Sequence, residues 1–208
     1  MATHPPPAKR PSSRPSARPP VRVQTNAERD RTVLRWLAVA DKVDFLSLLR
    51  LPQGVAPTDA QVRSAYHAFS RAFHPDQYRD AAPPIREAAA RVFAAGGDAY
   101  RVLNDPLLRI RYLRLLARGV ARVAVEELER AVRADVEKAR HATAAQLAKG
   151  ERAKEAAERA DHFLAMGELA YAKRALEEAL ALEPDNMPLA AKLEAIEVKL
   201  FAPRGRKP

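Results

Sequence analysis

An all-α fold is the class that this sequence predicts, and three observations lead to it. The chain has 208 residues, of which 47% are hydrophobic but only 6% aromatic, so its cores must consist mainly of Ala, Leu and Val. Ala and Leu favour helices. Only seven glycines are present, and no run alternates apolar with polar residues between turn signals. Apolar residues recur instead at spacings of three and four, which indicates helices around one or two small cores.

Charge and composition divide the chain into parts. The net charge is +10, and residues 1–27 carry five basic and no acidic groups. Residues 28–118 carry fifteen basic against ten acidic groups, and residues 119–208 carry sixteen of each. We predict a disordered Pro/Arg-rich tail over 1–24, a first helical domain over 25–118, a long connecting helix over 119–150, a helical hairpin with a covering helix over 151–201, and a basic tail over 202–208.

The first 24 residues hold seven prolines among Ser, Ala and Arg. Such a segment buries too little apolar surface to offset the chain entropy lost on ordering, so we expect it to be disordered. Its five cations could bind nucleic acid or an anionic membrane by counterion release. Because no aromatic residue is interleaved for base stacking, a solubilising leader is favoured over nucleic-acid binding.

The sequence lacks the features of several other classes. Without Cys there can be no disulfide, thiolate zinc site or cysteine nucleophile. No apolar run approaches the roughly 18 residues of a membrane-spanning helix, and the first residues lack the apolar centre of a signal peptide. We find no phosphate-binding glycine loop and no nucleophile constellation. We therefore expect a soluble, cytoplasmic protein with no membrane span, which is not an enzyme and holds no cofactor or metal.

Helix-start signals open the first two elements. Thr25 with Glu28 forms a capping box before a helix expected over residues 27–41. Asp44 is placed to cap a short helix that carries Phe45, Leu48 and Leu49. A proline and a glycine soon after it, at positions 52 and 54, are expected to end that helix.

A third helix, expected over residues 59–73, begins at the capping box of Thr58 and Gln61. Its spacing predicts two different faces. The face expected to be buried carries Val62, Ala65, Tyr66, Phe69 and Phe73. The opposite face carries Arg63, His67 and Arg71, which lie four residues apart and should form one exposed stripe.

The tripeptide His74-Pro75-Asp76 follows this helix directly. A helix expected over residues 84–103 comes next, so the two helices should form an antiparallel hairpin with the tripeptide at its apex. Proline stiffens such a turn, and the carboxylate of Asp76 is placed among cations. Gly96 and Gly97 should weaken the second helix, with a kink or local mobility left open. Asp105 and Pro106 then end it and begin another helix.

Residues 43–113 resemble the J-domain of DnaJ-type co-chaperones. The resemblance is carried by DFLSLLRLP from Asp44, AYHAFSRAFHPD from Ala65 to Asp76, DAYRVLNDP from Asp98 to Pro106, and by Arg109 and Tyr112. It implies docking on a DnaK-type chaperone and stimulation of that chaperone's ATP hydrolysis. It assigns activation to His74, Pro75 and Asp76, and docking to Arg63, His67 and Arg71. Ala72 and Gln77 stand where many members of the family carry a cation, which makes the expected docking surface less positive.

Beyond Gly119 the sequence predicts further helices. A long amphipathic helix carrying Val125, Leu128, Val132, Val136 and Ala139 should end by Gly150. Residues 153–186 resemble one tetratricopeptide repeat, in Ala160, Phe163, Gly167, Ala172, Ala179 and Pro184, and a last helix with Leu189, Leu193 and Ile196 should cover it. A single repeat cannot form an extended peptide groove. An adaptor or oligomerisation module for an unidentified protein is therefore favoured over a peptide receptor for residues 119–201.

Two hypotheses follow for the whole chain. In the first it is a J-domain co-chaperone whose C-terminal helices hold a further protein. In the second it is a non-catalytic helical scaffold with a J-like fold and a basic tail for nucleic acid or anionic surfaces. The intact tripeptide favours the first.

Overall fold

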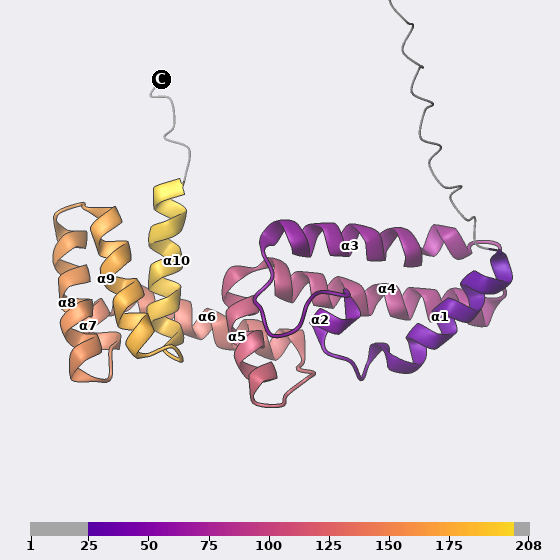
Figure 1. Ribbon diagram of the computed structural model, residues 1–208, viewed down its shortest axis with the longest axis horizontal. Helices are drawn as coiled ribbons and strands as arrows, with labels where there is room; N and C mark the ends of the chain where they lie inside the picture. Colours follow the sequence, from indigo (N-terminus) through magenta and orange to yellow (C-terminus); the bar gives the residue numbers. More distant parts are fainter. Residues whose placement is uncertain (1–24, 202–208) are drawn as a thin grey trace, which may run out of the picture.

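The computed structural model describes residues 25–201, and within this range it contains ten α-helices, one 3₁₀ turn and no strand. The all-α class is therefore confirmed. Helices α1–α5 form one half of the molecule and α7–α10 the other, with α6 running between them (Figure 1). The tails predicted over residues 1–24 and 202–208 lie outside the described residues.

Side-chain caps begin the first three helices as the sequence predicts. These are α1 (Asn26–Ala40), α2 (Phe45–Leu48) and α3 (Asp59–Phe73). Thr25 forms its capping box with Glu28, and Thr58 forms one with Gln61. The carboxylate of Asp44 accepts hydrogen bonds from the Ser47 amide at 2.9 Å and the Ser47 hydroxyl at 2.6 Å. Because each cap satisfies an amide that has no partner inside the helix, local sequence fixes these start points.

The hairpin consists of α3 and α4 (Pro83–Asn104), which pack side by side, with α1 against α4 (Figure 1). The weakness left open at Gly96 does not break α4, which is one helix from end to end. Gly96 is buried, and a Cβ atom at this position would overlap the ring of Phe69 from α3. The glycine therefore serves close packing between the two helices.

The core of this half is built on large side chains. Phe45 of α2 and Tyr112 of α5 (Pro106–Ala117) are almost completely buried, with ring centroids 4.6 Å apart. The Tyr112 hydroxyl accepts a hydrogen bond from the Phe45 amide at 2.8 Å and donates one to the carbonyl of Ala121 at 2.9 Å. Burial raises the pKa of Tyr112 to about 12. One hydroxyl therefore joins α2, α5 and the segment that leaves this half.

The long helix predicted over residues 119–150 is instead two helices, α6 (Val125–His141) and α7 (Ala144–Leu147). The chain turns because Thr143 forms a third capping box, with Gln146. The carboxylate of Asp161 also accepts hydrogen bonds from the amides of residues 144 and 145, at 2.8 and 2.9 Å. Three free amides at the start of α7 are thereby satisfied, which favours a new helix over continuation of α6.

The second half is a hairpin of α8 (Glu151–Ala165) and α9 (Leu169–Leu182), covered by α10 (Met187–Phe201). The buried residues of α8 and α9 are nearly all alanines, namely Ala153, Ala156, Ala157, Ala160, Ala172, Ala175 and Ala179, with Leu176. Small side chains let two helices approach closely. The helices match the predicted hairpin and cover, while the domain boundaries drawn from the sequence remain a prediction.

Ion pairs connect the first half to α6 and to the second half. Arg111 of α5 pairs with Asp135 of α6, and Arg118 of α5 lies 2.9 Å from Asp185, just before α10. Arg114 lies 3.8 Å from the same carboxylate of Asp185. Within residues 25–201, no helix has the length and apolar character needed to cross a membrane.

Candidate functional site

The tripeptide lies at the apex of the α3–α4 hairpin, where His74 is at once the C-cap of α3 and the N-cap of the 3₁₀ turn Pro75–Tyr78. The His74 ring accepts a hydrogen bond at Nδ1 from the Asp76 amide, at 3.3 Å. The Gln77 amide donates to the His74 carbonyl at 2.9 Å. Pro75 sits at the start of the turn, where its fixed φ is preorganised. The apex is thus a defined turn.

His74, Pro75 and Asp76 are all exposed, as the sequence predicts. The Asp76 carboxylate lies 3.6 Å from Arg79 and 3.5 Å from the His74 ring, and its side chain is 68% exposed. Contacts of this kind between exposed groups contribute little to stability, so a partner can replace them at small cost. The carboxylate at the apex is therefore accessible to a cation of another protein.

The apex rests on residues that the sequence analysis did not single out. The Tyr78 ring is buried beneath it, and its hydroxyl donates to the carbonyl of Ala72 at 3.0 Å. Burial raises the pKa of Tyr78. Arg29 of α1 lies over the Tyr78 ring, 5.8 Å from its centroid, and 3.5 Å from the Gln77 side-chain oxygen. The His74 ring meets Phe93 of α4 edge-on at 5.4 Å. The helix α1, outside the segment that resembles a J-domain, thus supports the apex.

Arg63, His67 and Arg71 are exposed, and the i, i+4 spacing places them along one flank of α3. None of the three forms an ion pair with another described residue. The charges of Arg63 and Arg71 are therefore available to an anionic surface and are screened only by solvent and salt. Ala72 and Gln77 are exposed as well, so the two positions that depart from the family pattern also lie on the surface.

Aromatic contacts fix the position of α3, which carries both the stripe and the apex. Trp36 of α1 meets Phe69 and Phe73 edge-on, with centroids 6.3 and 5.8 Å apart. Tyr66 stacks on Tyr100 of α4 at 4.2 Å. Such pairs stabilise beyond the area that they bury. They hold α3 from both sides, and only its outer flanks remain exposed.

Comparison with known proteins found similarity over part of the chain. It is 40% identical over 70 residues to the co-chaperone protein HscB homolog of Bordetella pertussis, which covers 34% of this chain and 41% of that protein. It is 37% identical over 79 residues to the HscB homolog of Cupriavidus taiwanensis, covering 38% of this chain and 44% of that protein. It is also 32% identical over 90 residues to DnaJ homolog subfamily C member 11 of Mus musculus, covering 43% of this chain and 15% of that protein.

The chain spans about two fifths of the length of the HscB homologs that it matches. No family model and no solved structure matches it. Over roughly a third of its length, the chain is therefore similar to co-chaperones of the J-domain type.

Proposed function

We propose that this chain is a J-domain co-chaperone that docks on a DnaK-type chaperone and stimulates its ATP hydrolysis. The observation that carries this proposal is the exposed His74-Pro75-Asp76 turn at the end of a helix whose outer flank bears three unpaired basic side chains. The similarity to HscB and DnaJ homologs supports it. In this role, the ATPase chemistry belongs to the chaperone.

The stripe and the apex would act at different stages of docking. Exposed cations attract an anionic surface over about a Debye length, so Arg63 and Arg71 would speed encounter, and the stripe that they form with His67 would orient α3. The apex would then make short-range contacts through His74 and Asp76. A carboxylate that forms a charge-assisted hydrogen bond is difficult to replace, because packing cannot supply the same interaction.

We further propose that residues 119–201 bind an unidentified protein as an adaptor, or associate with a second copy. A single hairpin of α8 and α9, similar to one tetratricopeptide repeat and covered by α10, supports an adaptor over a peptide receptor. Exposed apolar residues at the turn that joins α8 to α9, Met166 (63% exposed) and Tyr171 (54% exposed), offer such a module a contact surface.

The test is single-turnover ATP hydrolysis by a purified DnaK-type chaperone with and without the full chain. We expect the chain to accelerate hydrolysis. His74→Gln or Asp76→Asn should reduce the acceleration by roughly tenfold or more, since each removes a contact of about 1.5 to 3 kcal/mol. Asp80→Asn is a matched control, because it removes the same charge from an exposed position four residues away.

Circular dichroism should show that these variants remain folded, because every substituted side chain is exposed. Arg63→Ala combined with Arg71→Ala should weaken docking and reduce its dependence on salt. Equal stimulation by the chain and by Asp76→Asn would contradict the proposal. Binding that survives Asp76→Asn but needs residues 1–24 would instead favour the helical scaffold with a basic tail.

A further inference from the structure

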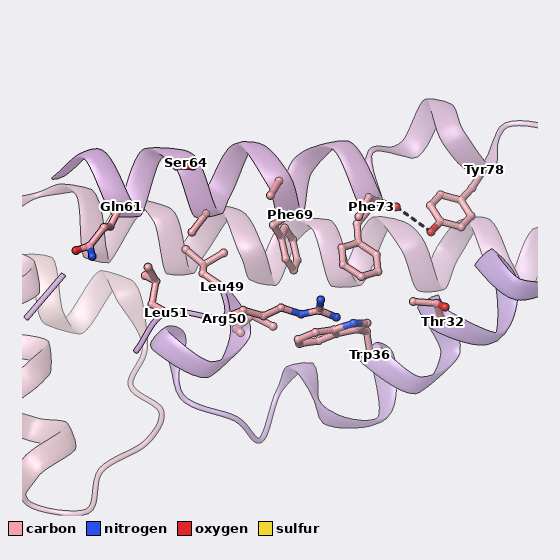
Figure 2. A pocket seen from close by; sticks show the side chains of 14 residues that line it. Thr32, Trp36, Leu49, Arg50, Leu51, Gln61, Ser64, Phe69, Phe73 and Tyr78 are labelled. Atoms are coloured by element: carbon pink, nitrogen blue, oxygen red, sulfur yellow. Dashed lines mark hydrogen bonds between the residues drawn. The ribbon is translucent and has the colours of Figure 1, made fainter. Parts of the chain in front are cut away.

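A groove of 510 Å³ lies between α1, α2 and α3, on a flank of α3 that the proposed function does not use (Figure 2). Trp36 of α1, Leu49 beside α2, and Phe69 and Phe73 of α3 give it an apolar lining. Figure 2 shows these side chains pointing into the space between the three helices, from Gln61 at one end to Tyr78 at the other. That length corresponds to about three turns of α-helix.

The groove is distinct from the proposed chaperone-docking surface. Apart from the aromatics, the wall contributed by α3 consists of Gln61, Ser64, Ala65, Ala68 and Ala72. At 100° per residue, these positions centre on one side of α3, and Arg63, His67 and Arg71 centre on the neighbouring side, about 120° around the helix. None of those three side chains lines the groove, and neither do His74, Pro75 and Asp76.

Arg50 is the only residue with a full charge at neutral pH among those that line the groove, and no acidic side chain is present there. Its guanidinium lies over the Trp36 ring, 5.4 Å from the centroid, and is drawn across the opening in Figure 2. Within residues 25–201, Arg50 has no hydrogen-bonded carboxylate and no ion pair. An unpaired guanidinium beside an apolar surface favours a ligand that is apolar and carries a carboxylate.

The backbone of Arg50 gives a second, independent indication. Its φ of 57° makes it the only described residue other than glycine in the left-handed region. It directly follows the end of α2, where its amide donates to Ser47 at 3.1 Å and the Leu51 amide donates to Leu46 at 2.8 Å. This hydrogen-bond pattern normally has glycine at the left-handed position. Arginine is therefore unfavourable for the turn itself. We infer that it occupies this position because its side chain serves the groove.

We propose that this groove binds an acidic amphipathic helix of a partner protein. The apolar edge of that helix would contact Trp36 and Phe69, and one of its carboxylates would pair with Arg50. Helices bind in apolar grooves through residues spaced i, i+3, i+4 and i+7, and about three turns would fill this one. The chain's own residues 1–24 are a poor occupant, because they carry five cations and no acid to pair with Arg50. This site goes beyond the proposed function, since none of the six residues assigned to chaperone activation and docking lines it.

Binding in the groove can be measured by the fluorescence of Trp36, because it is the only tryptophan of the chain. The probe is a synthetic helix of about 14 residues with Leu at the i, i+3, i+4 and i+7 positions and Glu elsewhere, titrated into the full chain. We expect a saturable change in Trp36 emission and in the anisotropy of a labelled peptide. The same peptide with Lys in place of every Glu should bind roughly tenfold more weakly or worse.

Arg50→Gly separates binding from stability. The affinity for the acidic peptide should fall by roughly tenfold. The melting temperature of the protein should not fall, because glycine suits the left-handed backbone. Ala68→Glu should also weaken binding by placing a like charge in the wall. Arg152→Ala, which removes one positive charge from an exposed position on α8, should leave peptide affinity unchanged.

Three results would overturn the proposal. The first is the absence of a saturable change with the acidic peptide, and the second is equal affinity for the acidic and basic peptides or for the chain and Arg50→Gly. The third is a change in the peptide-free Trp36 emission on deleting residues 1–24 or on diluting the protein. That result would assign the groove to the chain's own N-terminal segment or to a second copy.

Discussion

The two halves of this molecule are helical to a similar degree but obtain their cores in different ways. Around α2–α5 the core depends on large, individually placed side chains such as Phe45, Phe69 and Tyr112, which pack beside the smaller buried residues of α4. In α8 and α9 they are almost all alanine. A large side chain fixes its neighbours by shape, whereas a small one acts by allowing backbones to approach. The first core should therefore fail when volume is removed, and the second when volume is added.

Removing volume from the first half should give the largest effect. Phe45→Ala deletes a ring that is 1% exposed and packed on Tyr112, and should lower the free energy of unfolding by about 3 to 5 kcal/mol. Urea denaturation measures it. In the second half, Phe201→Ala is the comparison, because Phe201 is 77% exposed and its loss should change little. Similar losses from both would contradict the contrast between the cores.

Adding volume to the core should destabilise the second half, which tolerates little extra volume between its backbones. Ala160 is fully buried on α8, so Ala160→Leu should destabilise by about 1 to 3 kcal/mol through overpacking. Ala165→Leu, in the last turn of the same helix but exposed, is the matched control and should be close to neutral. Thermal melts of the two variants test this. If Ala160→Leu were neutral, close approach of backbones would not be what holds this hairpin together.

At Gly96 the first half, like the second, depends on a small residue that lets two helices approach closely. Gly96→Ala places a methyl group against the Phe69 ring and should destabilise by about 1 to 2 kcal/mol, even though alanine favours helix more than glycine does. Phe69→Leu should recover part of this loss, so a double-mutant cycle should show coupling between the two sites. Gly97→Ala is the control, since nothing lies within 4 Å of a Cβ atom there. Additive effects would show that the ring is not the obstacle.

The smallest effect should come from a helix cap in the first half. Burial raises the pKa of Asp44, but hydrogen bonds from Ser47 and Gln53 outweigh burial and hold it below its ordinary value. A carboxyl whose pKa is lower in the folded state than in the unfolded state stabilises the fold. This stabilisation is complete above the pKa in the unfolded state, about 3.9, and it is lost as the pH falls through the lower pKa in the folded state.

Asp44→Asn keeps a capping side chain but removes this titration. Below about pH 4, the stability of the original chain should therefore fall more steeply than that of the variant. Denaturation series over this pH range, measured on both proteins, provide the comparison. Parallel curves would mean that the cap carboxylate contributes nothing that depends on its charge.

Local signals explain how much of the fold could be predicted. The helix starts at Thr25, Asp44, Thr58 and Asp105 were predicted because the chemistry of a cap lies within four residues. The break between α6 and α7 was missed although Thr143 and Gln146 form the same kind of signal, because amphipathic spacing was followed past it. At Gly96 the sequence predicted only a weakened helix, because the reason for a glycine there is the ring of Phe69 from another helix.

The candidate site also has features that one helix alone predicts and features that depend on packing between helices. Exposure of Arg63, His67 and Arg71 follows from helical periodicity, which is a property of α3 alone. The support that Arg29 and Tyr78 give the apex depends on how α1 packs, and no spacing within either segment encodes it. The groove at Arg50 needs three helices at once. Contacts between distant segments are therefore what the sequence left unpredicted, and the roles of the site residues stay predictions.

The short connection between the halves affects how a cargo bound by the second half would be presented to the chaperone. Only residues 118–124 separate α5 from α6, and ion pairs join α5 to Asp135 and to Asp185. Under the proposed function, a cargo bound near α9 would meet the chaperone held at the apex with a high effective concentration. That advantage exists only for cargoes whose size and attachment permit simultaneous engagement. The short junction would therefore select cargo by geometry as well as by affinity.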